Sequence, residues 1–233
     1  MEKVIGALGE AFMEANSGVN FTYNPTGSGS GITAVSEGRC DIGLSSRALK
    51  DSEVASGLVG TVLAYDGIAM IVNPANTVED LDIETIAKIY TGEITNWSEV
   101  GGADAEIVLV GREAGSGTRS AVEELLGLED VDESFVAGVM DATSGVIQSV
   151  KGNDAAIGYI SYGSMSTDVK ALQVDGVACS AETVKDGSYA ISRPFLVVTK
   201  EGSTNEAAQK FIDYMLSDAG QKIVTDSNYV SVK

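Results

Sequence analysis

The stretch Arg112 to Arg119, REAGSGTR, lies directly after the apolar segment Ile107 to Val110 and directly before a helical pattern. We expect a strand over 107–110 and a helix over 118–126, so this stretch forms a strand-to-helix turn. The first turn of a helix attracts anions through its unpaired amides and the helix dipole, and glycines let the backbone approach a ligand closely. Ser116 and Thr118 add hydroxyl donors, and Arg112 or Arg119 adds a planar guanidinium. The stretch predicts an anion site, although an ordinary helix N-cap beside solvated arginines gives the same pattern.

A second stretch has the same design. Thr26 to Gly31, TGSGSG, lies between an expected strand at 19–23 and an expected helix at 32–37. Its spacing lacks the pattern of dinucleotide-binding loops and the lysine of nucleotide-triphosphate loops, so a flexible turn is the alternative to an anion site. A third piece, Ser45 to Arg47, ends an expected strand at 41–45, where ligands gather at the carboxyl edge of parallel sheets; a plain surface turn is its alternative.

Two such loops predict two groups of residues that bind one oxyanion between them. The residues expected to bind this oxyanion are Ser28, Gly29, Ser30, Ser46 and Arg47 in the first group and Arg112, Ser116, Gly117 and Thr118 in the second. Backbone amides, hydroxyls and at least one arginine would hold the anion through fixed local dipoles. Such a site can bind an anion even in a protein with a strongly negative net charge, because the attraction comes from local dipoles.

The rest of the chain alternates helical and extended patterns. Apolar residues recur at helical spacing from Val4 to Ala15, so the chain begins inside an amphipathic helix. Further helices are expected at 83–90, 144–150 and 205–216, and further strands at 61–72, 155–161 and 195–199. This alternation predicts an α/β protein with a mostly parallel sheet and helices on both faces. We see no flexible linker, so two lobes would be joined by crossing strands near 70–73 and 193–196.

Composition removes several function classes. The chain has 233 residues and a formal net charge of −19, which disfavours nucleic acid and anionic membranes as partners. It has no histidine, so histidine-based catalysis and histidine metal sites are excluded. The longest apolar candidate, Gly67 to Val72, is far shorter than the roughly 20 residues of a membrane span. Cys40 and Cys179 lack metal-ligand spacing, and we expect two buried thiols rather than a disulfide. We expect no metal and no cofactor.

Several segments, in this order along the chain, resemble the phosphate-binding proteins that serve ABC transporters. They are Gly27 to Ile32, Asp41 to Arg47, Tyr90 to Trp97, Arg112 to Arg119 and Ile157 to Ile160. The resemblance implies a two-lobed type II periplasmic-binding-protein fold with a two-strand hinge. It implies that Ser28, Arg112, Ser116, Gly117 and Thr118 contact phosphate. It also implies a membrane ABC permease as partner and an extracytoplasmic location, in the periplasm or at the cell surface, with a possible lipid anchor in the full-length protein.

Two departures from that family stand out. Many members have an Asp where this chain has Ser46, and that carboxylate accepts a hydrogen bond from protonated phosphate. Its absence weakens discrimination against sulfate, and Arg47 suggests a site with more positive charge. Relatives also begin with a strand and a Gly-, Ser- and Thr-rich loop, whereas Met1 to Lys3 run directly into the first helix without a signal peptide. We therefore expect a sequence shorter than the natural gene product.

The resulting hypothesis is a monomeric, non-enzymatic binding protein that captures inorganic phosphate between lobe I, residues 1–70 plus 196–233, and lobe II, residues 73–192. One alternative changes the ligand to sulfate, molybdate or tungstate, and another is a phosphate sensor or adhesin that does not serve transport. An enzyme with Ser116 or Ser46 as nucleophile would need a base. No histidine exists, and no lysine has a suitable spacing.

Overall fold

The chain folds as two compact units, and the second is inserted into the first. The structure is a computed structural model that describes residues 1–128, 136–203 and 205–233. Unit 1 is Met1–Asp66 with Arg193–Lys233, and unit 2 is Gly67–Ser192. The divisions fall four and three residues before the lobe ends expected at 70 and 196. Two strands pass the divisions: β2 (Leu58–Val72) and β9 (Ser192–Lys200).

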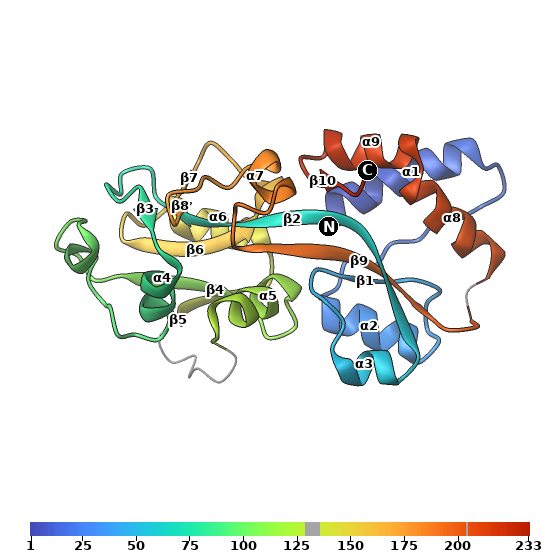
Figure 1. Cartoon of the computed structure of the whole chain (residues 1–233), viewed down its shortest axis with the longest axis horizontal. Coiled ribbons are helices and arrows are strands. Elements are labelled where there is room, and N and C mark those ends of the chain that lie inside the picture. Colours follow the sequence, from blue (N-terminus) through green and yellow to red (C-terminus); the bar gives the residue numbers. More distant parts are fainter. Residues whose placement is uncertain (129–135, 204) are drawn as a thin grey trace. The chain divides into compact units, whose positions relative to one another are not determined.

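Unit 1 is built around β9 and the first half of β2, which are neighbours in the sheet. The strand β1 (Gly43–Ser45) pairs antiparallel with β9, and β10 (Val230–Ser231) pairs antiparallel with β2. Its helices are α1 (Glu2–Ala15), α2 (Ser28–Ser36), α3 (Asp51–Ala55), α8 (Glu206–Leu216) and α9 (Asp218–Asp226) (Figure 1). Successive residues of a strand point to opposite faces, so β9 can carry a core on each side.

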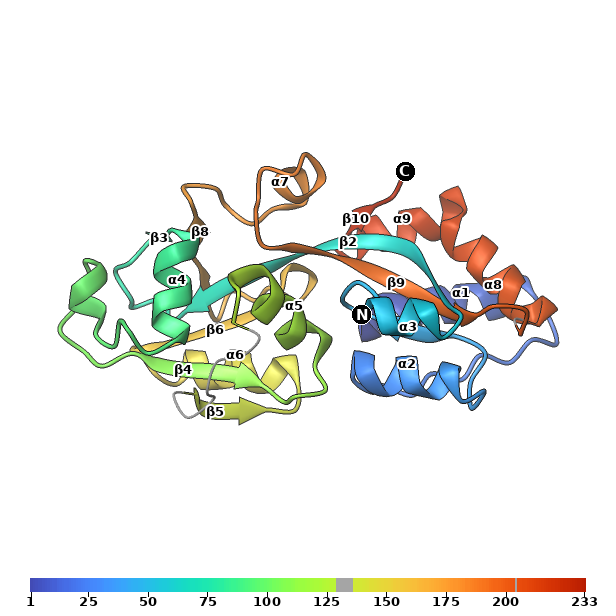
Figure 2. The ribbon, with the colours of Figure 1, turned by 60° about the horizontal axis from the view of Figure 1, so that its bottom comes forward.

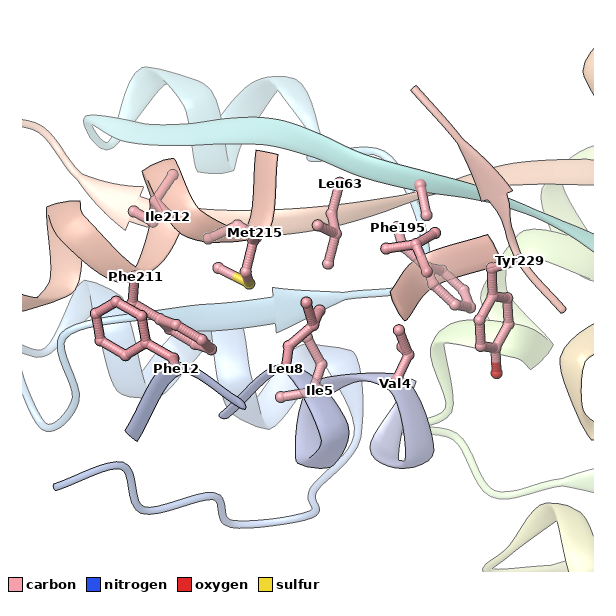
Figure 3. Close-up of a cluster of buried hydrophobic side chains, with 13 residues drawn as sticks. Val4, Ile5, Leu8, Phe12, Leu63, Phe195, Phe211, Ile212, Met215 and Tyr229 are labelled. Carbon is pink, nitrogen blue, oxygen red and sulfur yellow. The ribbon is translucent and has the colours of Figure 1, made fainter. Parts of the chain in front are cut away.

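The two cores of unit 1 follow that alternation along β9. Phe195 and Val197 belong to the cluster drawn in Figure 3, where side chains of α1, α8 and β2 meet. Leu196 and Val198 belong to a second cluster with Ile32 and Val35 of α2. Helices therefore cover both faces of this sheet, and α2 is held against the face opposite α1. That packing fixes the helix whose first turn carries the serine- and glycine-rich stretch.

Unit 2 contains the strands β4 (Val108–Arg112), β5 (Val136–Met140) and β6 (Ala156–Ser161). β4 lies between β5 and β6 and runs parallel to both, whereas β6 pairs antiparallel with the second half of β2. Short strands complete the unit: β7 (Lys170–Ala171) on β2, and a separate parallel pair of β3 (Asp80–Leu81) and β8 (Gln173–Val174). Its helices are α4 (Ile83–Tyr90), α5 (Gly117–Leu126), α6 (Thr143–Lys151) and α7 (Ala181–Lys185).

Two adjacent residues of β6 show that helices also cover both faces in unit 2. Gly158 lies against α6, since a β-carbon there would sit 2.8 Å from Val146 Cγ1. The next residue, Tyr159, points the other way and its ring centroid lies 6.0 Å from that of Tyr90 in α4. Figure 2 shows α4 and α5 on one side of β4 and β6, with α6 on the other.

The predicted elements are present, with three corrections. The sheet is mixed instead of mostly parallel, because β1 pairs antiparallel with β9, and β6, β7 and β10 pair antiparallel with β2. The expected strand at 19–23 has no regular secondary structure: Val19, Phe21 and Tyr23 pack against the core of unit 1, but none of the strands that the structure describes pairs with their backbone. The helix expected from Ile32 begins at Ser28. Glycine and serine are weak helix formers, and packing overrides that preference.

The structure also tests the expectations for the two cysteines and for membrane-spanning helices. No disulfide joins Cys40 and Cys179. Cys40 is exposed and Cys179 is half-buried, so the expectation of two buried thiols is wrong; Cys40 follows the turn after α2, outside the packed face of that helix. Within the described ranges, every helix is too short or too polar to cross a bilayer.

Candidate functional site

In unit 1 the start of α2 and the end of β1 meet through serine hydrogen bonding. The Ser46 amide donates to Ser28 Oγ at 3.0 Å, and the Ser28 side chain is buried. Gly27 is the N-cap residue of α2 and supplies no side-chain acceptor, so the first-turn amides at Ser28, Gly29 and Ser30 keep their donor capacity. We call Ser28 to Ser30 with Ser46 the first loop cluster. Its hydroxyls and amides are donors of the kind that an oxyanion accepts.

Two glycines allow this close approach. A β-carbon on Gly31 would lie 3.1 Å from the Leu44 carbonyl oxygen, and one on Gly43 would lie 2.8 Å from the Gly31 carbonyl oxygen. The backbones of α2 and β1 therefore touch where the first loop cluster forms. Side chains at these positions would push α2 away from β1 and separate Ser28 from Ser46.

Arg47 is committed to a carboxylate of its own unit. Its Nη1 and Nη2 donate to Glu53 Oε2 and Oε1 at 2.9 and 2.8 Å, and Nη1 also donates to the Ala48 carbonyl at 2.7 Å. The Arg47 side chain is 8% exposed. The hydrogen bond from Arg47 is the main reason that the pKa of Glu53 is lowered. The extra positive charge expected from Arg47 is thus balanced, because the pair is neutral as a whole.

In unit 2, Arg112 ends β4 and is held by several acceptors. Its Nε and Nη2 donate to the two carboxylate oxygens of Glu113 at 3.0 and 3.1 Å. Further bonds reach the Met140 and Asp141 carbonyls and the Thr143 hydroxyl, at 3.1, 3.2 and 3.3 Å. A guanidinium has five N–H groups, and these contacts leave one hydrogen on Nη1 for a ligand. The orientation of Arg112 is therefore fixed without any ligand.

The first turn of α5 supplies the second set of donors. Ser116 is the N-cap residue, and its hydroxyl accepts from the Arg119 amide at 3.4 Å. Ser116, Gly117 and Thr118 are all buried. Thr118 forms no side-chain hydrogen bond with any residue that the structure describes, so its hydroxyl is available. We call Arg112 with Ser116 to Thr118 the second loop cluster.

Three residues beside this cluster escaped prediction. Glu113 carries the counter-charge of Arg112, Thr143 at the start of α6 accepts from it, and Tyr159 Oη accepts the Arg112 amide at 3.2 Å. Burial raises the pKa of Tyr159 to about 12, so the phenol stays protonated at neutral pH. Glu113 follows Arg112 directly in the sequence, which was a usable signal. Thr143 and Tyr159 come from distant segments that only the fold brings to β4.

The arginines considered for the site share one property: each is paired with a glutamate of its own unit. Arg119 Nε donates to Glu123 at 2.6 Å, and its Nη1 donates to the Arg112 carbonyl at 3.0 Å. Arg119 therefore stabilises the turn between β4 and α5. Each loop cluster is therefore close to electrically neutral. Oriented amides, hydroxyls and helix dipoles remain as the attraction for an anion, and they persist in a chain of net charge −19. Among the described residues, no group of three or more acidic or cysteine side chains could hold a metal ion.

Known proteins similar to this chain identify its family. A model of the PBP superfamily domain matches residues 1–219. The phosphate-binding protein PstS of Bacillus subtilis (strain 168) is 36% identical over 239 residues, which cover 100% of this chain and 78% of the Bacillus protein. The chain belongs to the PstS family. PstS of Borreliella burgdorferi is 31% identical over 233 residues, covering 95% of this chain and 83% of that protein.

Solved structures related to this PstS-family chain agree with its fold. A phosphate ABC transporter substrate-binding protein of Clostridium perfringens, solved with bound phosphate, is 44% identical with a TM-score of 0.93, covering 99% of this chain and 95% of that chain. An ABC-type phosphate transport receptor from Vibrio cholerae is 33% identical with a TM-score of 0.85, covering 97% and 94%. The fold is that of a type II periplasmic binding protein.

Proposed function

We propose that this chain binds inorganic phosphate and delivers it to an ABC transporter, without catalysis. The observation that carries the proposal is the second loop cluster: a rigidly held Arg112 precedes a helix start whose hydroxyls and first-turn amides can donate to an anion. Membership of the PstS family supports phosphate as the anion, as do the Bacillus relative described as a phosphate-binding protein and the Clostridium structure solved with bound phosphate.

The proposed contacts come from both loop clusters. In unit 2, Arg112 Nη1, the Ser116 and Thr118 hydroxyls and the Gly117 amide would donate to phosphate oxygens. In unit 1, Ser28, Gly29, Ser30 and Ser46 would donate to the same ion. Arg47, held by Glu53 and by the Ala48 carbonyl, would stabilise the turn that follows Ser46. Charge-assisted hydrogen bonds to an anion are the strong class, so a small number of them gives useful affinity.

The transport role sets location and partner. A phosphate carrier for an ABC permease works outside the cytoplasm, and we place this chain there on the strength of its relatives. A lipid anchor in the full-length protein is part of the same proposal. Capture requires that the phosphate-bound form be the one that the permease recognises.

Ser46 bears on selectivity among anions. A hydroxyl can donate to or accept from a ligand, whereas a carboxylate at this place would repel any anion without a proton. We therefore expect this chain to bind phosphate with weaker exclusion of sulfate than relatives that carry Asp there. Sulfate is the competitor to include in every binding measurement.

Calorimetric titration with phosphate, sulfate and molybdate in turn tests the proposal. Phosphate should give saturable binding, and Thr118→Val should weaken it by about 10- to 100-fold, because a hydrogen bond to a charged group is lost. Thr77→Val, an exposed threonine of unit 2, is the matched control and should bind as the wild type does. Binding of sulfate or molybdate with no response to phosphate would overturn the ligand assignment.

A further inference from the structure

The end of β4 has a backbone amide that the sheet leaves without a strand partner. The parallel register between β4 and β6 ends at Val110 and Gly158, two residues before Arg112. On the other side of β4 the pairing with β5 continues to Arg112 and Met140. The Arg112 amide donates instead to a side chain, the Tyr159 hydroxyl, at 3.2 Å. A phenol thus replaces the missing backbone carbonyl.

Side chains and backbone together hold both peptide groups of Arg112. Tyr159 accepts its amide, and Arg119 Nη1 donates to its carbonyl at 3.0 Å. The next amide, that of Glu113, donates to the Met140 carbonyl at 3.1 Å. The direction in which the Arg112 side chain leaves the strand, and the path into the turn before Ser116, follow from these bonds.

Tyr159 is well suited to this task because it cannot move easily. Its side chain is buried, with 4% of the residue exposed, and its ring packs against Tyr90. The preceding Gly158 lets β6 lie tightly against α6. The ring is therefore held by Tyr90 on one face of the sheet, while the strand that carries it is held against α6 on the other face.

We propose that Tyr159 is a positioning residue for anion binding, which fixes the Arg112 backbone so that the guanidinium and the start of α5 are ready for the ligand. The proposal rests on the proposed function, since it assigns a role toward the same second loop cluster. Tyr159 itself does not touch the anion. Without the hydroxyl, the Arg112 amide has no acceptor, and the peptide regains the freedom to turn.

Tyr90 provides a matched control. It is a second buried tyrosine of unit 2, and its ring packs against Tyr159. Its hydroxyl is buried without a hydrogen-bond partner in the described part of the chain. Tyr90→Phe therefore removes a buried hydroxyl from the same neighbourhood and breaks no hydrogen bond. Tyr159→Phe removes one that holds Arg112.

The first test is phosphate titration of the wild type, Tyr159→Phe and Tyr90→Phe, at a temperature where all three are folded. We expect Tyr159→Phe to raise the Kd about tenfold and Tyr90→Phe to leave it within twofold. A merely structural role would lower the melting temperature without changing the affinity of the folded protein. Equal affinity in all three proteins would overturn the proposal, whereas a wild type that ignores phosphate would instead overturn the proposed function.

The second test does not depend on phosphate. Amide hydrogen exchange, followed by NMR, should show the Arg112 amide protected in the wild type and in Tyr90→Phe, and rapidly exchanging in Tyr159→Phe. Should Tyr159→Phe fail to fold, the wild type alone still decides. An Arg112 amide that exchanges as fast as an exposed loop amide would show that Tyr159 does not hold it.

Discussion

At the scale of single residues, the central finding is that arginines near the loop clusters are matched by glutamates. Arg47 pairs with Glu53, Arg112 with Glu113, and Arg119 with Glu123. The sequence identified the arginines as sources of positive charge, because a guanidinium next to glycines and serines is typical of anion sites. Two of the partners had a local signal, since Glu113 follows Arg112 directly and Glu123 lies four residues after Arg119. Glu53 had none, because it is six residues from Arg47 and only the turn between them brings the two together.

The Arg47–Glu53 pair gives a prediction for stability. Glu53→Gln should lower the free energy of unfolding by about 1–3 kcal/mol, because it breaks a largely buried, two-pronged ion pair. Glu37→Gln is the control, since Glu37 pairs with Arg39 on the surface, and it should cost less than about 1 kcal/mol. Urea unfolding of both variants measures the difference, and an equal effect would contradict a special role for the buried pair.

The same pair has a pH dependence of known sign. The pKa of Glu53 is lowered from 4.5 in the folded state, mainly by the hydrogen bond from Arg47. The folded protein therefore binds this proton more weakly than the unfolded chain does. The stabilisation is complete above the ordinary pKa and is lost as the pH falls through the lower folded value. Below that value Glu53→Gln and the wild type should converge in stability.

At the scale of elements, patterns of apolar residues predicted type better than they predicted ends. The helices over 83–90 and 118–126 were expected from their periodicity, and the structure has them as α4 and α5. The segment 19–23 alternates as a strand does, and its apolar side chains face the core, but a strand also needs a partner that no local pattern reveals. The start of α2 was missed because glycine and serine signal a loop, whereas packing on β1 makes the segment helical.

That packing gives a prediction for an element. Gly43→Ala would place a β-carbon 2.8 Å from the Gly31 carbonyl oxygen, closer than real contacts allow. We expect a loss of about 1–3 kcal/mol in unfolding free energy, as for other overpacked sites. Gly6→Ala, in α1 with open space around it, should instead be neutral or stabilising by up to about 1 kcal/mol. If thermal unfolding shows Gly43→Ala to be harmless, the close contact of α2 and β1 is not what holds them.

At the scale of the whole molecule, the chain passes between its units at two places. One residue from each place contributes to a single buried ion pair. Asp66 is the last residue of unit 1 before the first division, and Arg193 is the first after the second. Arg193 Nη2 lies 3.1 Å from Asp66 Oδ2, with side-chain exposures of 3% and 0%. Arg193 also lies over the Phe195 ring, 5.4 Å from its centroid. The pair ties β2 to β9 where both strands leave unit 1.

Removing one partner of such a pair leaves the other charge buried. Asp66→Asn should therefore lower the free energy of unfolding by about 3–5 kcal/mol, measured by urea or guanidinium unfolding. Asp218→Asn, which removes an exposed partner of Lys233, should change it by less than about 1 kcal/mol. A similar small effect at both positions would show that the buried pair contributes little to holding β2 and β9 together.

The sequence indicated the two loop clusters, because each cluster has its own local signature of glycine, serine and a following helix. It could not indicate how each cluster is built. Ser28 and Ser46 are 18 residues apart, Arg112 and Thr143 are 31 apart, and Arg112 and Tyr159 are 47 apart. Contacts of that span follow from strand register and helix packing, which only the folded chain specifies.

One measurement tests the central claim most directly: calorimetric titration of phosphate into the wild type, Ser28→Ala and Thr118→Val. If both loop clusters hold one ion, the wild type binds a single phosphate per chain, and either substitution weakens that same event about tenfold or more. Two independent binding events in the wild type, each lost with only one of the substitutions, would contradict the claim. So would a Ser28→Ala variant that binds phosphate as tightly as the wild type.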